Sequence, residues 1–148
     1  MSFERVKQYF QSANAADHLL TFEASSATVE LAAQAVGCEP ARIAKTLSFL
    51  TEEGPVLIVA AGDVKIDNQK YKAYFHQKAR MIPRDEVEAY IGHEPGGVCP
   101  FAVKDGVRVF LDASLQRFDT VYPAAGSPNS AAKLTLKELE TLSQCCHW

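Results

Sequence analysis

A chain of 148 residues with 22% charged and 47% apolar residues has the balance of an ordinary globular protein, which excludes a disordered or membrane-embedded chain. At this length we expect one domain, spanning 1–148, that buries roughly two-thirds of its unfolded surface. The net charge of -3 excludes a generally basic coat for nucleic acid, so we expect no DNA partner, although a few cations can still contact phosphates locally.

The patterning of the chain shows neither a signal peptide nor a membrane span. No basic segment precedes an apolar run at the N-terminus, and no stretch approaches the roughly 18 apolar residues of a spanning helix. We therefore expect a cytoplasmic protein without a membrane partner. The cysteines include no CxxC pair, so we expect reduced thiols and neither a metal nor another cofactor. The tail Cys145-Cys146-His147-Trp148 has a metal-like composition, but chain ends usually fray.

The first expected elements are two helices separated by a short strand. Apolar residues at i, i+3 and i+7 from Phe3 predict an amphipathic helix that ends at 12–14. A short strand is expected over 18–22. Hydroxyl side chains at 25–28 then offer N-caps for a helix that stops at Gly37. The apolar stripe of this helix consists of Val29, Ala32, Ala33 and Val36.

A β-hairpin is expected next. One or two helical turns at 39–44 lead into a strand over 45–50, a turn follows at 51–54, and a nearly continuous apolar run covers 55–61. Because this run does not alternate with polar residues, we predict that it is buried on both faces, in the middle of a sheet.

Two helices and two strands are expected in the following segment. One helix runs from about Gln69 to Phe75 after a cap at Asp67 or Asn68, and a second opens at Pro83 and closes at Gly92. The inward side of the second helix is predicted to carry Val87, Tyr90 and Ile91. The two strands are expected at 107–111 and 120–123.

A loop of small residues at 124–130 and a final helix complete the chain. Thr135 and Glu138 fit a capping box, and the leucines that follow, Leu136, Leu139 and Leu142, are predicted to pack inward. Helices and strands are mixed without regular βαβ alternation. This order favours an α+β domain over a doubly wound one.

The loop 92–101 combines three glycines with two prolines. Gly96 and Gly97 carry no side chains, so a ligand can approach the backbone closely and their N–H groups can face an oxygen-rich ligand. The alternative is a structural turn between a helix and a strand.

Lys45 is the most unusual charged residue, because it lies among apolar residues at the beginning of a predicted strand. One interpretation places its ammonium at the mouth of the sheet, where it meets a phosphate or carboxylate. In the other, the side chain extends along apolar surface and keeps its charge in water.

Cys99 and His93 share one loop, which raises the hypothesis of a thiol nucleophile assisted by imidazole. The alternative gives Cys99 a small apolar role in lining a pocket. Asp112 either orients a base or water, or caps the following turn. Ser127 either donates to a ligand or serves turn chemistry, and Asp63 with Lys65 either borders a cleft or forms a solvated pair.

Several ordered segments together resemble a known family. They are Thr28-Val29-Glu30-Leu31-Ala32-Ala33, Ile43-Ala44-Lys45-Thr46-Leu47, Gly96-Gly97-Val98-Cys99-Pro100-Phe101, Phe110-Leu111-Asp112 and Ala125-Gly126-Ser127. Over nearly its whole length the chain resembles the YbaK / prolyl-tRNA synthetase-associated editing-domain family. The resemblance implies a single α+β domain with a mixed, largely antiparallel, barrel-like sheet flanked by helices. It also implies hydrolysis of the ester of mischarged aminoacyl-tRNA, in cis or in trans.

The resemblance implies site residues as well. Lys45 matches the family lysine that is implied to engage the 3'-terminal nucleotide of tRNA. The segment from Gly96 to Pro100, including Gly97, matches the GxxxP loop that is implied to hold the substrate and position the attacking water. Cys99 stands where many members carry a small hydroxyl residue. Implied substrate-binding positions are Thr28, Thr46, Cys99, Phe101, Asp112 and Ser127.

These observations lead to three hypotheses. The first is a freestanding deacylase that hydrolyses a small amino acid, such as Ala, Cys or Ser, from tRNA(Pro) or a related tRNA. Its partners would be the aminoacyl-tRNA 3' end and a synthetase or elongation factor. The second is a non-catalytic module that binds an aminoacyl or nucleotide ligand and regulates a partner, and the third is a thiol hydrolase that uses Cys99.

Overall fold

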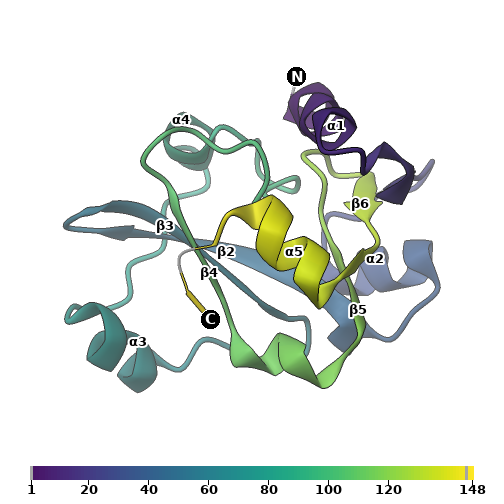
Figure 1. Ribbon diagram of the computed structural model, residues 1–148. Coiled ribbons are helices and arrows are strands. Elements are labelled where there is room, and N and C mark those ends of the chain that lie inside the picture. Colours follow the sequence, from purple (N-terminus) through teal and green to yellow (C-terminus); the bar gives the residue numbers. More distant parts are fainter. Residues whose placement is uncertain (1, 146) are drawn as a thin grey trace.

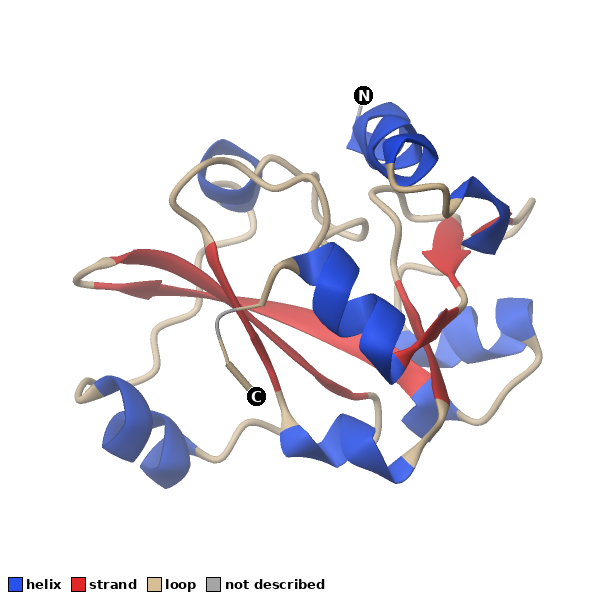
Figure 2. Cartoon of the chain, in the orientation of Figure 1, coloured by secondary structure: helices blue, strands red, loops and turns tan. Residues whose placement is uncertain are grey.

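Five strands form the main sheet of the computed structural model, in the order β4 (Arg108–Leu111), β3 (Gly54–Ala61), β2 (Ile43–Thr51), β5 (Thr120–Pro123) and β7 (Leu134–Thr135). The structure describes residues 2–145 and 147–148. Helices surround this twisted sheet (Figure 1), and Figure 2 shows how its strands curl into a half-barrel. A separate antiparallel pair joins β1 (Leu19–Thr21) to β6 (Ser130–Ala132). In the described chain, the pairs β2/β3, β5/β7 and β1/β6 are antiparallel, whereas β2/β5 and β3/β4 are parallel. The predicted mixed α+β fold is therefore confirmed.

The N-terminal elements are α1 (Ser2–Ser12), η1 (Ala16–His18), β1 (Leu19–Thr21) and α2 (Val29–Val36). The predicted caps of α2 are confirmed, because Thr28 Oγ1 accepts from the N–H of Leu31 at 3.1 Å and Gly37 ends the helix in the left-handed conformation. The strand predicted over 18–22 is shorter than expected. Its first residue belongs to the 3-10 turn η1, and β1 has three residues.

The predicted hairpin consists of β2 (Ile43–Thr51) and β3 (Gly54–Ala61), after the short turn η2 (Pro40–Arg42). Its register runs from Ala44 opposite Ala61 to Thr51 opposite Gly54. All residues of β3 from Val56 onward are buried, and β3 has strands on both sides. The prediction of an internal strand that is buried on both faces is therefore confirmed.

The next elements are α3 (Asn68–Phe75), α4 (Val87–Ile91), β4 (Arg108–Leu111) and η3 (Ala113–Arg117). Asp67 caps α3, as predicted. The helix predicted from Pro83 begins only at Val87, because the preceding residues form a turn in which the N–H of Glu86 bonds to the Pro83 carbonyl. Tyr90 is 36% exposed, so only Val87 and Ile91, one turn apart, pack inward from α4.

The chain ends with β5 (Thr120–Pro123), β6 (Ser130–Ala132), β7 (Leu134–Thr135) and α5 (Leu136–Ser143). Both halves of the capping box are present, since Thr135 Oγ1 accepts from the N–H of Glu138 and the Glu138 carboxylate accepts from the N–H of Thr135. The short strands β6 and β7 are not predicted by the sequence. Serine and alanine at 130–132 carry no β-branched or aromatic signal.

Two larger apolar clusters cover the two faces of the main sheet, and a third joins Ala32 and Ala33 of α2 to Ile43. The larger cluster joins α1, α4 and α5 to one face, and its fully buried members include Val6, Phe10, Phe101 and Leu139. The smaller cluster packs α3 on the other face through Tyr71, Phe49 and Ile58. Among the described residues, no helix has the length and apolar character needed to cross a membrane.

The outer edge of β2 is interrupted. Near its beginning, Ile43 and Ala44 pair with β5. Near its end, the Ser48 carbonyl accepts from the N–H of Ile82 and the N–H of Leu50 donates to the Arg80 carbonyl. Between these contacts, at 45–47, no described strand pairs with this edge. The sheet therefore has an opening that is bordered by two distant parts of the chain.

Candidate functional site

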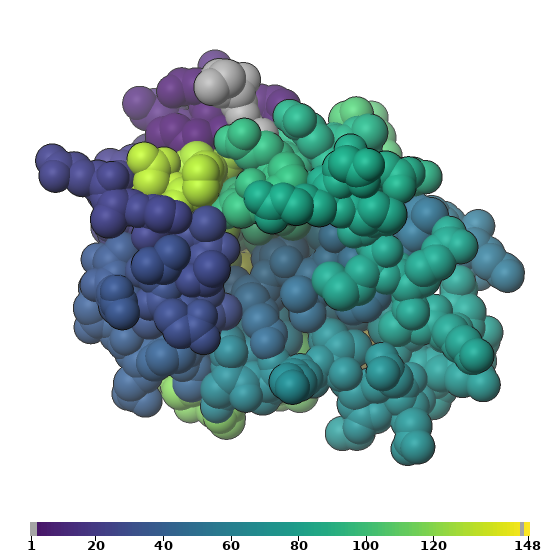
Figure 3. Space-filling view, turned by 180° about the vertical axis from the view of Figure 1, so that it is seen from behind, coloured from purple at the N-terminus to yellow at the C-terminus, as the bar shows by residue number. Residues whose placement is uncertain are grey.

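The candidate site is a cleft of about 540 Å³ at this opening, called here the β2 cleft. Lys45, Thr46 and Leu47 line it along the strand, and the beginning of α2 forms one wall. Figure 3 shows the hollow between the dark blue segment that includes α2 and the teal segment near 80–100. The remaining walls include Met81, Arg84, Val87, Pro95, Gly96, Val98, Tyr122 and Ser130.

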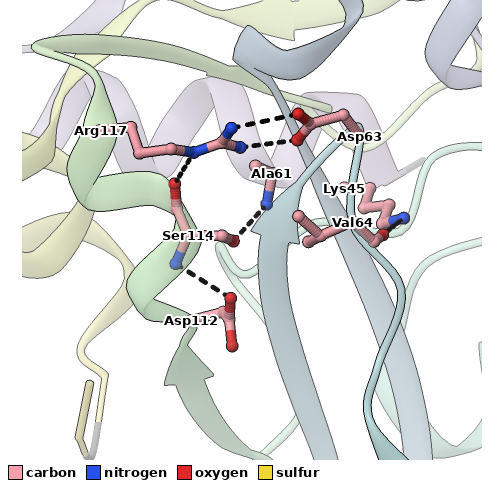
Figure 4. A network of polar contacts seen from close by, with 7 residues as sticks. All are labelled: Lys45, Ala61, Asp63, Val64, Asp112, Ser114 and Arg117. Atoms are coloured by element: carbon pink, nitrogen blue, oxygen red, sulfur yellow. Dashed lines mark hydrogen bonds and ion pairs between the residues drawn. The ribbon is translucent and has the colours of Figure 1, made fainter.

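Lys45 is half-buried, and its Nζ atom donates a hydrogen bond to the carbonyl of Val64 in the loop after β3 (Figure 4). The same loop is fixed by Arg117, whose guanidinium donates to the Asp63 carboxylate at 3.1 and 2.6 Å. The hydrogen bond from Arg117 is the main cause that lowers the pKa of Asp63, and the Lys45 charge adds to it. The ammonium is thus held beside the cleft, and an anionic ligand would compete with the Val64 carbonyl for it.

The charged side chains of the cleft are all positive. Lys45 and Arg84 are the only ionised groups among the described residues that line it, and those residues include no carboxylate and no imidazole. The protein as a whole carries a net charge of -3. The β2 cleft is therefore a local cationic site on an acidic protein, which favours an anionic ligand.

The glycine-proline loop forms a tight turn at the cleft wall. The N–H of Gly97 donates to the Glu94 carbonyl at 3.0 Å, and Gly96 has a φ of +90°. A Cβ atom on Gly97 would lie 2.6 Å from both the Gly126 carbonyl carbon and the Ser127 nitrogen. This glycine therefore allows two loops of small residues to pack backbone against backbone.

The backbone N–H groups of Gly96 and Gly97 were both expected to face a ligand, but they differ in the structure. The Gly97 N–H is used inside the turn and does not face a ligand. The Gly96 N–H has no hydrogen-bond partner within the described part of the chain, and Gly96 lines the cleft. Of the two expected backbone donors, only the Gly96 N–H is therefore available to a ligand in the described structure.

Thr28 and Thr46 both line the cleft, with different hydrogen bonding. The Thr28 hydroxyl accepts from the N–H of Leu31 as the cap of α2. The Thr46 Oγ1 atom is buried and has no partner in the described chain. A buried hydroxyl without a partner costs free energy, so a polar ligand group that satisfied Thr46 would be stabilised there.

Cys99, Pro100 and Phe101 are buried behind the cleft rather than in its wall. Cys99 and Phe101 belong to the main apolar cluster, and the Phe101 ring packs edge-on against Phe10 at a centroid distance of 5.0 Å. These three residues therefore do not line the β2 cleft, and their expected contact with substrate stays a prediction. Val98, which sequence reasoning did not single out, occupies the wall position.

The thiol-nucleophile hypothesis is contradicted by burial and protonation. Cys99 is 0% exposed, and burial raises the pKa of its thiol to about 12. The Sγ atom lies 3.5 Å from His93 Nε2, but this nitrogen also lies 2.6 Å from the Phe101 carbonyl, an acceptor that requires the proton to be on Nε2. The imidazole nitrogen near the thiol therefore cannot accept its proton.

Asp112 and Ser127 have structural roles. Asp112 Oδ2 accepts from the N–H of Ser114 at 3.0 Å as the cap of η3, and Asp112 lines a separate cavity rather than the β2 cleft. The Ser127 hydroxyl is hydrogen-bonded to Asn129 and Ser130 at 2.9 and 2.6 Å. The capping interpretation of Asp112 and the turn interpretation of Ser127 thus fit the structure, and neither residue lines the β2 cleft.

Sequence reasoning missed other wall residues, including Met81, Arg84, Tyr122 and Ser130. All four are far from β2 in the sequence, with Tyr122 paired opposite Ile43 and Ser130 opposite Thr21, so no local pattern identifies them. Among the described residues, no group of three or more His, Cys, Asp or Glu side chains is suited to hold a metal ion. Cys146, part of the metal-like tail, lies outside the described residues.

Sequence comparison finds relatives of two kinds, a protein of similar length and a much longer tRNA ligase. A protein of Bacillus subtilis (strain 168) described as uncharacterized protein YwhH is 50% identical over 100% of this chain and 95% of its own length. A proline--tRNA ligase of Limosilactobacillus fermentum is 32% identical over 60% of this chain, which spans 17% of that enzyme.

Structural comparison finds solved structures of similar fold. A crystal structure of a candidate trans-editing enzyme for prolyl-tRNA synthetase has a TM-score of 0.89 and 29% identity, and the match covers 99% of this chain and 94% of the other. The hypothetical protein APE2540 has a TM-score of 0.86 at 24% identity, covering 97% and 96% of the two chains, which shows the shared fold. The sequence model of the aminoacyl-tRNA editing domain matches residues 23–142. The chain belongs to the aminoacyl-tRNA editing domain family.

Proposed function

We propose that the protein is a deacylase that acts in trans on mischarged tRNA and hydrolyses the ester of a small amino acid such as Ala, Cys or Ser. The observation that carries the proposal is the β2 cleft, in which the ionised side chains of the described residues are the cations Lys45 and Arg84. A tRNA end brings phosphates to such a site, and single-stranded ends need only a few contacts of this kind.

The chemistry requires little from the protein, because an aminoacyl ester is already activated. Lys45 would hold the phosphate of the terminal nucleotide, and the Gly96 N–H would donate to the oxyanion that develops on the ester carbonyl. Thr46 Oγ1 would form a hydrogen bond with a polar group of the substrate. Since no carboxylate or imidazole of the described chain lines the cleft, a hydroxyl or side chain of the substrate would assist the attacking water.

The cleft also limits the amino acid that it can accept. Its volume of about 540 Å³ must hold the terminal ribose as well as the aminoacyl group. Its walls near the glycine-proline loop carry apolar side chains, including Val87 and Val98. A small uncharged amino acid fits this space, with one methylene worth about 1–3 kcal/mol of discrimination.

A deacylation panel tests the proposal. We expect the protein to release at least one of Ala, Cys and Ser from tRNA(Pro) and to leave correctly charged prolyl-tRNA(Pro) intact, as measured by the rate of amino-acid release. Related tRNAs charged with the same amino acids would define the tRNA preference. Release rates equal to spontaneous hydrolysis on every substrate would refute the proposal.

The Lys45→Met substitution tests the role of the cation while retaining most of the aliphatic stem. Loss of a charged hydrogen bond is worth about 1.5–3 kcal/mol, so kcat/KM should fall by about 10- to 150-fold. Lys72→Met is the matched control, because Lys72 is exposed and does not line the β2 cleft. An unchanged kcat/KM in the Lys45→Met protein would refute this role of Lys45.

A non-catalytic module that binds an aminoacyl or nucleotide ligand is the second candidate function. The specific observation in its favour is the absence of an acid or base from the described residues that line the cleft. Tight binding of a non-hydrolysable aminoacyl-adenosine analogue, together with no turnover in the deacylation panel, would favour this candidate over the deacylase.

A further inference from the structure

A second cavity, of about 400 Å³, lies between α3, the end of β4 and the C-terminal Trp148. It is called here the aromatic cavity, because Tyr74, Phe75, Phe110 and Trp148 line it. Figure 1 shows the C-terminus beside β4, and the bridge between Phe110 and His147 fixes this arrangement. None of the cleft functions proposed above uses these residues.

The aromatic rings form a partly exposed, ordered surface. The Tyr74 and Phe75 rings pack edge-on against Phe110 at centroid distances of 5.7 and 5.1 Å. Trp148 Nε1 donates to the Glu140 carboxylate at 2.8 Å, which holds the indole. Tyr74 nevertheless remains 51% exposed. One side of the Tyr74 ring lies parallel to the His147 ring at a centroid distance of 6.2 Å. Rings that are held in place and remain partly exposed are suited to stacking against a planar ligand.

Two lysines of the cavity are available to contact phosphates. Lys65 and Lys70 line it, and neither ammonium has an ion-pair partner within the described chain. The lining also includes the carboxylates of Asp67 and Asp112, which accept hydrogen bonds from the backbone of α3 and of η3. The buried hydroxyl of Tyr71, another lining residue, lacks a hydrogen-bond partner in the described chain.

The aromatic cavity adjoins the β2 cleft. Val64 lines the aromatic cavity, and its carbonyl accepts the hydrogen bond from Lys45 Nζ, which belongs to the cleft. Lys45 and Phe110 also lie on the same face of the sheet, since Lys45 pairs with Ala60, and Ile58 two residues away pairs with Phe110. A polymer that left the cleft past Lys45 would therefore reach the aromatic cavity next.

We propose that the aromatic cavity binds nucleobases of a single-stranded RNA 3' end whose terminal nucleotide occupies the β2 cleft. The bases would stack on Tyr74 and its neighbouring rings, and Lys65 and Lys70 would contact the phosphates between them. This inference rests on the proposed function, because it takes the cleft as the place of the terminal nucleotide. Stacking of this kind tolerates any base sequence, so it would add affinity for the RNA end without selecting the amino acid.

Two substrates of different length test the proposal in kinetic terms. The short one is an aminoacyl-adenosine ester, and the long one is an RNA minihelix with a single-stranded CCA end that carries the same amino acid. We expect Tyr74→Ala to lower kcat/KM by about tenfold or more on the long substrate and to leave the short one unchanged. Tyr90→Ala is the matched control, because Tyr90 is an exposed tyrosine outside both cavities. Equal loss on both substrates, or no loss on the long one, would overturn the proposal.

Binding can be followed without turnover, because Trp148 is the single tryptophan of the chain. We expect a short RNA that ends in CCA and carries no amino acid to change Trp148 fluorescence. The Tyr74→Ala protein should bind this RNA about tenfold or more weakly. An RNA of the same length without bases at the two positions before the terminal nucleotide should bind with a similar loss. Equal affinity for the two RNAs would overturn base stacking. If the wild-type protein hydrolysed neither substrate, the proposed function would fail, while this titration would still decide the base site.

Discussion

The Sγ atom of Cys99 lies 3.5 Å from Nε2 of His93 inside the protein. This distance alone suits a catalytic pair, but both groups are in their neutral forms. Burial raises the pKa of Cys99 to about 12 and lowers the pKa of His93, because the charged form of each loses hydration. The hydrogen bond of Nε2 with the Phe101 carbonyl keeps the proton on this nitrogen. The closeness of Cys99 and His93 thus reflects packing, and the group of this loop that we propose to act on substrate is the Gly96 N–H.

Thiol alkylation tests this assignment at the residue scale. Cys38 is partly exposed, whereas Cys99 is fully buried with a pKa of about 12. Because the thiolate is the reactive form, iodoacetamide at pH near 8 should modify Cys38 at least about a hundredfold faster than Cys99, as followed by peptide mass spectrometry. Deacylation should survive Cys99→Ser. Rapid modification of Cys99 in the folded protein, with parallel loss of activity, would restore the nucleophile hypothesis.

At the scale of elements, the cleft depends on the backbone contact between the glycine-proline loop and the segment around Gly126 and Ser127. Gly97→Ala would place Cβ 2.6 Å from backbone atoms that cannot rotate away. We expect the two loops to separate, with a loss of about 1–3 kcal/mol in the free energy of unfolding. Since small displacements of positioning groups are costly, kcat/KM should fall by about tenfold or more.

Gly106→Ala is the control for Gly97→Ala. Gly106 has a φ of +89° and open space around it, so the added methyl group strains the backbone without moving the two loops. Chemical denaturation should show a lower stability for both variants, whereas deacylation rates should fall only for Gly97→Ala. Unchanged catalysis in a folded Gly97→Ala protein would show that the loop contact does not shape the site.

The elements also show which parts of the structure local sequence determines. The caps Thr28, Gly37 and Thr135 were predictable, because capping involves residues three or four positions apart. Lys45 was predictable as the unusual cation of a strand. The position of Arg84 in the cleft and that of Asp112 in a separate cavity were not predictable. Both depend on where the edge of β2 has no neighbouring strand. That opening is a property of pairing between distant segments, which no local pattern records.

For the whole molecule, α1 is part of the core although it precedes the region 23–142 that matches the family. Val6 and Phe10 are fully buried, and the Arg5 guanidinium donates to the Gly92 carbonyl at the beginning of the glycine-proline loop. Buried His93 lies next to this contact, and the Arg5 charge adds to the desolvation that lowers the pKa of His93. The N-terminal helix, the loop and the main core therefore form one packed unit around a neutral imidazole.

Acid destabilisation tests this unit as a whole. The pKa of His93 is lower in the folded protein than its ordinary value of 6.5, so the unfolded chain binds more protons below that pH. The stability that neutral His93 contributes is present above pH about 6.5 and is lost as the pH falls toward the folded-state pKa, by at most about 1.4 kcal/mol per pH unit. His93→Gln should weaken the dependence of the denaturation midpoint on pH between pH 7 and 5. His76→Gln, at an exposed site, should show the same pH dependence as the wild type. Parallel pH profiles for the wild type and His93→Gln would show that acid acts on the fold elsewhere.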